Sequence, residues 1–104
     1  MKVFGNDEKR KKIESLSKEY QNYQLLLREA HENLAEYDEQ KIRYGKRLIA
    51  HVDNVIETLN EDDKFIIKKE VTEGQTGEWY LGYYSSSSYY RHRIKAYGNF
   101  LDCL

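Results

Sequence analysis

The first part of the chain alternates apolar and polar positions in a regular way. Between residues 13 and 37, apolar side chains recur at alternating intervals of three and four residues. This heptad spacing places them on one face of a helix, while charged and amide side chains fill the other faces. The stripe consists of Ile13, Leu16, Tyr20, Tyr23, Leu27, Ala30, Leu34 and Tyr37.

A second helical stripe lies between residues 42 and 59, and Gly45 interrupts it at modest cost. Residues 38–41 contain no strong helix breaker, so two geometries remain open. Either the chain turns near residues 37–41 and the helices pair as a hairpin, or one helix of roughly 50 residues runs through, about 75 Å long. We favour the hairpin, because a lone helix of that length needs a partner chain to bury its stripe. The second stripe consists of Ile42, Ile49, Val52, Ile56 and Leu59, with Leu48 and Val55 beside it.

Shorter elements follow after residue 59. An acidic cluster at residues 60–63 is typical of a helix start, and the apolar residues up to Val71 predict a helix of two to three turns. Gly74 is expected to end this helix, because glycine readily adopts the positive φ of a helix C-terminus.

Two further helices are expected before the end of the chain. Thr76 can cap a short second helix, which is expected to include Trp79 and Tyr80 and could extend to Tyr83. The four serines at positions 85–88 are predicted to cap a last helix from residue 89 to about residue 102. The absence of proline agrees with an all-α fold, since proline breaks helix interiors.

Composition and charge limit the classes of function that the chain can have. Lys and Arg number 17 against 18 Asp and Glu, so the whole chain gives no electrostatic case for nucleic acid. No apolar run reaches the roughly 20 residues of a membrane span, and the N-terminal residues lack the apolar run of a signal peptide. We therefore expect a cytoplasmic protein with no membrane partner. The single cysteine, Cys103, is expected to be a reduced thiol.

The chemistry-bearing residues do not point to an enzyme. Carboxylates are numerous, but none pairs with a nucleophile in a recognisable arrangement. His31, His51 and His92 are scattered along the chain, so we expect no metal site. The chain is predicted to be non-enzymatic and to need no cofactor.

The order of elements after residue 59 indicates a small helix-turn-helix. In such a motif the last helix enters the major groove of DNA, and its N-terminal residues reach base edges. The segment 85–95 would be the recognition segment, since residues 85–104 contain three permanent positive charges and only one acid, Asp102. The candidate DNA-binding residues are Ser86, Ser87, Ser88, Tyr90, Arg91, Arg93 and Lys95.

The C-terminal 45 or so residues resemble a known family. The segments TEGQTGEWY and YYRHRIKAYGNFL, with Ala96 and Tyr97 as a small-plus-apolar pair, are similar to phage-type transcriptional regulators of the ArpU/RinA kind, and through them to region 4 of bacterial sigma factors. The resemblance implies a helix-turn-helix that binds DNA. The chain departs from the family in a longer, serine-rich turn and in His92, which takes a position that is usually aliphatic.

The last helix has two registers that agree with its sequence. In the register of the family, the core-facing residues are Tyr89, His92, Ala96 and Phe100. In the register with the best apolar periodicity, they are Tyr90, Ile94, Tyr97 and Leu101. Both registers place Ser88, Arg91 and Lys95 on the outward face.

The predicted architecture is all-α, with long helices at residues 1–59 and a helix-turn-helix at residues 60–104. We expect a transcription regulator that binds double-stranded DNA, whose long helices supply homodimerisation, a contact to RNA polymerase, or both. The alternative is a helical adaptor for another protein, in which the C-terminal helices only complete a bundle. The two differ in whether Arg91 and Lys95 are exposed or pack against the Glu-rich long helices.

Overall fold

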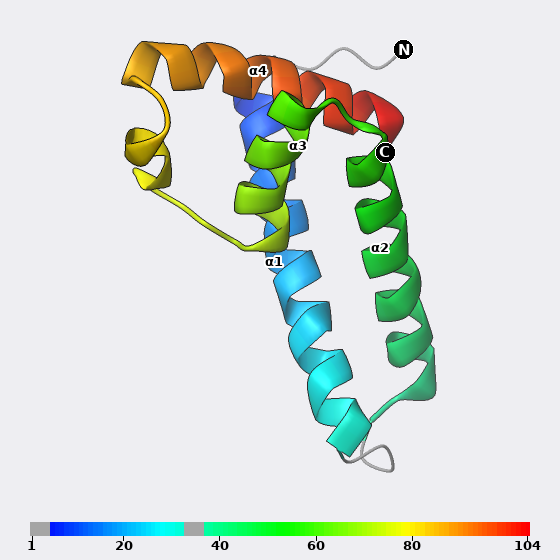
Figure 1. The fold of residues 1–104 in the computed structure, drawn as a ribbon. Coiled ribbons are helices and arrows are strands. Elements are labelled where there is room, and N and C mark those ends of the chain that lie inside the picture. The colour runs from blue at the N-terminus through cyan, green and yellow to red at the C-terminus, as the bar shows by residue number, and fades with distance from the viewer. Residues whose placement is uncertain (1–4, 33–36) are drawn as a thin grey trace.

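The two long helices form an antiparallel hairpin in the computed structural model, which describes residues 5–32 and 37–104 (Figure 1). Helix α1 (Asn6–Glu32) packs along helix α2 (Glu39–Thr58). The predicted hairpin is therefore confirmed, and the alternative of one continuous helix is wrong. Asp38 caps α2 by accepting a hydrogen bond from the backbone N–H of Gln40 at 2.8 Å, so residues 39–41 already belong to the helix.

The heptad stripe of α1 faces the interior of the molecule. Four of its members are buried and Tyr23 and Leu27 are half-buried, while Leu34 lies outside the described residues. On α2 the second stripe is buried toward its C-terminal end. Gly45 is buried opposite Tyr23, where a Cβ atom would lie 2.6 Å from the ring carbon Cδ1. The close approach of the two helices explains why this position has no side chain. The buried members of the α1 stripe are Ile13, Leu16, Tyr20 and Ala30.

The third helix begins at the acidic cluster, as the sequence predicts. Helix α3 (Glu61–Ile67) is capped by Asn60, whose side chain accepts from the backbone N–H of Asp63 at 2.9 Å. It continues as a π-helical segment, η2 (Lys68–Thr72), and ends before Gly74, whose φ is 67°. The expected stop at Gly74 is confirmed.

The expected second short helix is reduced to a single turn. Residues 79–82 form a 3-10 helix, η3 (Trp79–Gly82), with no side-chain cap. The prediction that Thr76 caps a helix here is wrong, because Gly77 follows it with a φ of 69° and turns the backbone away from a helical path. The connection from η2 to the last helix thus spans residues 73–85, longer than the three- to four-residue turn of a typical helix-turn-helix.

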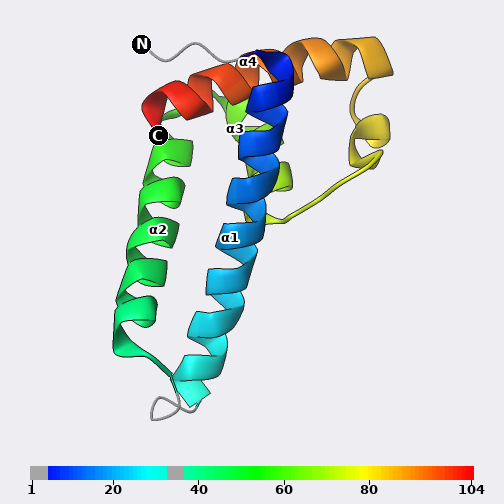
Figure 2. The same ribbon diagram turned by 180° about the vertical axis from the view of Figure 1, so that it is seen from behind.

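The last helix lies across the end of the hairpin at which α1 begins and α2 ends (Figures 1 and 2). Helix α4 (Ser86–Cys103) begins three residues before the predicted start and is capped by Ser85, so residues 86–88 form its first turn. Its register is mainly the first of the two predicted, since Tyr89, Ala96 and Phe100 are buried whereas Tyr90 and Ile94 are 48% and 41% exposed. Tyr97, which the second register places inward, is buried as well.

One hydrophobic core joins the long helices to the C-terminal elements. Buried residues of α1, α2, α3, η2 and α4 form a single cluster, so residues 1–59 and 60–104 share their interior. Burial of this surface is the main force that holds α4 against the hairpin. Within the described ranges, none of the helices combines the length and apolar character that a membrane crossing requires.

Candidate nucleic-acid interface and adjoining cleft

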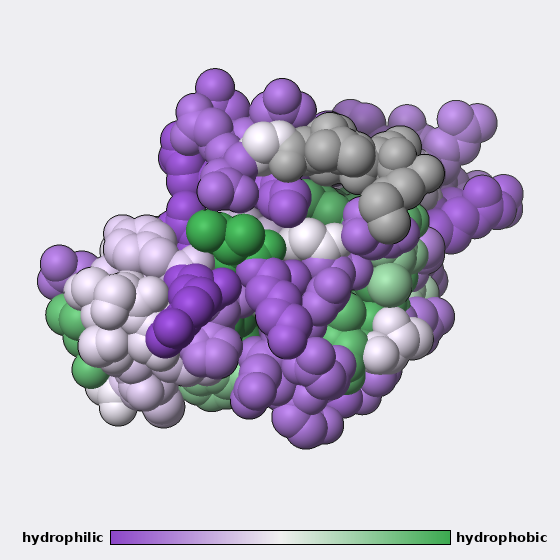
Figure 3. All heavy atoms as spheres, turned by 90° about the horizontal axis from the view of Figure 1, so that it is seen from above, coloured by the Kyte–Doolittle hydropathy of each residue, from purple (hydrophilic) through white to green (hydrophobic). Residues whose placement is uncertain are grey.

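One side of α4 is exposed and basic. Ser87, Arg91 and Lys95 recur at four-residue spacing and are all exposed; we call these three residues the outer face of α4. Every ion pair found among residues 5–32 and 37–104 involves other cations, so neither Arg91 nor Lys95 is neutralised by a described acid. Seen from this end, hydrophilic side chains cover much of the molecule (Figure 3).

The other candidate residues lie around this face. Ser86 and Tyr90 are exposed beside it, at the beginning of α4. Ser88, which both predicted registers place on the outward face, is instead half-buried, and its backbone N–H donates to the Oγ atom of Ser85 at 3.3 Å. Six of the seven candidates therefore lie on or next to the outer face.

Arg93 lies elsewhere. It is two residues from Arg91, about 200° around the helix, and points to the opposite side. Its guanidinium lies over three tyrosine rings, with its central carbon 5.1 Å from the ring centre of Tyr90, 5.2 Å from that of Tyr97 and 5.9 Å from that of Tyr89. Cation–π attraction holds it there. The structure does not bring Arg93 together with Arg91 and Lys95.

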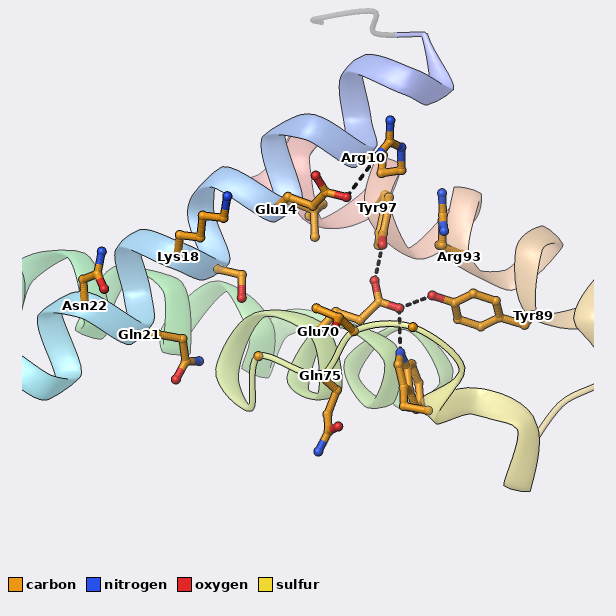
Figure 4. A pocket seen from close by; sticks show the side chains of 16 residues that line it. Arg10, Glu14, Lys18, Gln21, Asn22, Glu70, Gln75, Tyr89, Arg93 and Tyr97 are labelled. Carbon is orange, nitrogen blue, oxygen red and sulfur yellow. Dashed lines mark hydrogen bonds and ion pairs between the residues drawn. The ribbon is translucent and has the colours of Figure 1, made fainter.

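A buried carboxylate holds the inner side of α4. Glu70, in the π-helical segment η2, is 8% exposed and accepts three hydrogen bonds from aromatic side chains. Trp79 Nε1 donates to its Oε2 atom at 3.1 Å, the Tyr89 hydroxyl donates to the same oxygen, and the Tyr97 hydroxyl donates to Oε1 (Figure 4). Three donors around one carboxylate compensate for its removal from water.

A second buried acid links α3 to the far half of α4. Asp63 is 4% exposed and accepts from the side-chain amides of Asn99 at 2.6 Å and Asn60 at 3.1 Å. Together with Glu70, this acid joins the α3–η2 segment to α4 at two points along the helix. The orientation of the outer face is therefore determined by specific polar contacts as well as by the hydrophobic core.

Aromatic packing adds to this restraint near the start of α4. The rings of Tyr80 and Tyr89 stack with their centres 3.8 Å apart and their planes 2° from parallel. Phe65 contacts Trp79 and Tyr83 edge-on, at centre distances of 5.9 and 5.0 Å. The segment around the 3-10 turn η3 thus connects α3 to the first turns of α4 through aromatic side chains.

Glu70 was missed in the sequence reasoning, although its position contained a signal. It lies three residues after Ile67 and four after Ile66, on the same helical face as those two buried residues. A carboxylate on an apolar face needs buried donors. Its donors come from positions 9 to 27 residues further along the chain, and no local pattern identifies them.

Burial changes the acidity of three tyrosines. Removal from water raises the pKa of Tyr89 and of Tyr97, and the neighbouring charge of Glu70 adds to both effects. Burial also raises the pKa of Tyr20 to about 12, aided by the hydrogen bond that its hydroxyl donates to Asp53 at 2.7 Å. All three phenols therefore keep their protons in the folded chain at pH values where an unfolded chain begins to lose them.

We expect the free energy of unfolding to fall as the pH rises above about 10, the ordinary tyrosine pKa. Below this pH, Tyr20, Tyr89 and Tyr97 are protonated in both the folded and the unfolded chain. Above it, the unfolded chain releases these protons first, which favours unfolding. The stability that the three tyrosines contribute is therefore lost as the pH rises toward their folded-state pKa, which for Tyr20 is about 12. The loss is at most about 1.4 kcal/mol per pH unit for each tyrosine. Urea unfolding at about pH 8 and pH 11 measures it. Tyr20→Phe is expected to weaken the pH dependence, and equal free energies at both pH values would contradict the expectation.

A cleft of about 400 Å³ adjoins the inner side of α4. It lies between α1, the loop at residues 74–77 and α4, and Glu70 and its aromatic partners form part of its wall. Arg10 and Lys18 line it from α1 and Arg93 from α4 (Figure 4). No pattern in the sequence indicates that the basic start of α1 and the last helix meet at one cleft.

The described side chains offer no obvious metal centre, since no three of His, Cys, Asp or Glu gather at one point in residues 5–32 and 37–104. Comparison of the chain with protein-family models, curated proteins and solved structures finds no match.

Proposed function

We propose that the protein binds double-stranded DNA through the outer face of α4 and acts as a transcription regulator. The observation that carries the proposal is the exposure of Arg91 and Lys95, without acidic partners among the described residues, on a helix whose other side is fixed to the core. Arginine and lysine at this spacing suit contacts to guanine edges and phosphates. The resemblance to ArpU/RinA-type regulators implies the same function and remains a prediction.

The basic start of α1 supports the proposal from a distant part of the sequence. The Nζ atom of Lys9 lies 3.3 Å from the position that a Cβ atom on Gly98 would occupy, so α1 begins directly beside α4. Lys9 can therefore reach a phosphate of the same duplex that α4 contacts. A positive charge added at the edge of the interface would increase non-specific affinity and its dependence on salt.

Dimerisation would have to use residues other than the heptad stripe. Four members of the stripe, Ile13, Leu16, Tyr20 and Ala30, are buried within one chain and are unavailable to a second copy. Leu25 and Tyr44 are each 51% exposed on the hairpin and are the residues that we propose for a homodimer contact. A contact to RNA polymerase through the hairpin is the other role that we propose for the long helices.

Salt-dependent DNA binding tests the proposal. We expect binding to a duplex, followed by fluorescence anisotropy, to weaken steeply with salt. Arg91→Ala combined with Lys95→Ala is expected to reduce affinity at low salt about tenfold or more and to lower the slope of log affinity against log salt by about two. Lys46→Ala combined with Arg47→Ala is the matched control, since it removes the same charge from exposed positions on α2.

The absence of binding at low salt would overturn the proposal, as would equal effects of the two double variants. Either result would favour the adaptor alternative. That alternative has one specific observation behind it, a group of exposed large apolar side chains around η3 and the start of α4. The group consists of Leu81, Tyr83, Tyr90 and Ile94.

A further inference from the structure

Ile94 is a large apolar side chain on the basic side of α4. It is 41% exposed, and it lies outside both the buried cluster and the apolar side chains that pack against that cluster in residues 5–32 and 37–104. It follows Arg91 by three residues, about 60° around the helix, and directly precedes Lys95. An exposed isoleucine thus lies beside both cations of the outer face.

We infer that Ile94 contacts the 5-methyl group of a thymine when α4 binds DNA; the inference rests on the proposed function and adds a sequence preference to it. The major groove exposes this methyl group at every A·T pair, and apolar side chains recognise it. Helix residues three apart have Cβ atoms about 5–6 Å from one another, and successive bases of a strand are about 3.4 Å apart along the duplex. Arg91 and Ile94 can therefore contact neighbouring base pairs. The preferred duplex is expected to contain a thymine one or two steps from the base that Arg91 contacts.

Tyr90 is less suited to this contact, although it is 48% exposed. The guanidinium of Arg93 lies 5.1 Å from the centre of its ring, and the ring packs edge-on against Tyr80 and Tyr89. Tyr90 is also about 100° from Arg91 around the helix, further than Ile94. The methyl contact is therefore assigned to Ile94.

The two cations beside Ile94 favour DNA over an apolar protein surface as the partner. Arg91 and Lys95 are exposed and form no ion pair with an acid in the described ranges. An apolar protein surface would leave both charges unpaired at the edge of the contact. One groove of a duplex supplies phosphates and base-edge acceptors for the cations together with methyl groups for the isoleucine.

Replacement of thymine by uracil tests the inference, because uracil lacks only the methyl group. Duplexes that bind the full chain are selected from a random pool, and the enriched duplex is synthesised with uracil in place of each thymine in turn. Binding is measured by fluorescence anisotropy at low salt. We expect at least one replacement to weaken binding about fourfold, the effect of losing the burial of one methyl group.

Ile94→Ala is the decisive variant, because the side chain is exposed and its removal leaves the core intact. We expect it to bind the thymine and uracil forms of the sensitive duplex equally. Leu104→Ala is the matched control, since Leu104 is also 41% exposed and lies at the C-terminal end of α4, beyond the outer face. It is expected to keep the fourfold preference for thymine.

Three results would overturn the inference: a pool that yields no enriched sequence, an enriched duplex in which no uracil replacement weakens binding, or an Ile94→Ala variant that keeps the preference for thymine. In each case, salt-dependent binding that is weakened by Arg91→Ala combined with Lys95→Ala would still support the proposed function. The absence of any binding to the pool at low salt would overturn both.

Discussion

Glu70→Ala is expected to lower the free energy of unfolding by about 3–5 kcal/mol, which is the usual cost of removing one partner from a buried charged network. The substitution leaves the hydroxyls of Tyr89 and Tyr97 and the indole N–H of Trp79 without their common acceptor. Each unpaired buried donor costs about 1–3 kcal/mol. Urea unfolding followed by circular dichroism measures the change.

Glu70→Gln separates the charge from the hydrogen bonds. The amide keeps the volume of the side chain and one accepting oxygen, so we expect a smaller loss than in Glu70→Ala, about 1–3 kcal/mol. Tyr97→Phe, alone and combined with Glu70→Ala, completes a double-mutant cycle. An interaction energy near zero in this cycle, or a Glu70→Ala variant as stable as the natural chain, would show that the cluster does not hold α4 in place.

The hairpin could be predicted because its information is local. Heptad spacing identifies the buried face of a long helix without knowledge of its partner, and residues from Ile13 to Ala30 follow it. The choice between a hairpin and a continuous helix required one further physical argument, that an isolated stripe must be covered. The turn contains no strong helix breaker, and α2 begins after Asp38 because this side chain caps the helix.

The arrangement of the candidate site could be predicted only in part. Arg91 and Lys95 are exposed in both registers that the sequence allows, so their placement did not depend on long-range contacts. Arg93 was assigned to the same surface, but the rings of Tyr89, Tyr90 and Tyr97 hold it on the other side of the helix. The spacing of residues in the sequence does not show which cation packs against an aromatic cluster.

The register of α4 was ambiguous for a physical reason. Tyrosine has an apolar ring and a polar tip, so Tyr89 and Tyr90 are each acceptable in a core or at a surface. Apolar periodicity therefore favours two neighbouring faces almost equally. The structure selects between them through partners that are distant in sequence, since Glu70 accepts a hydrogen bond from Tyr89 and none from Tyr90.

Phe100→Ala is the stability test of that register. Phe100 is fully buried in the core that α4 shares with the hairpin, so we expect a loss of about 3–5 kcal/mol. At roughly 4–8 °C per kcal/mol for a domain of this size, the melting temperature would fall by more than about 10 °C.

Ile94→Ala is the matched control on the same helix, because Ile94 is 41% exposed and belongs to the other register. It is expected to cost less than about 1 kcal/mol, since little apolar surface is lost from the core. The comparison by thermal unfolding is decisive because the alternative register buries Ile94 in place of Phe100. If Ile94→Ala proved the more damaging change, α4 would be rotated from its position here, and Arg93 would have to be placed anew relative to the cleft and to the outer face.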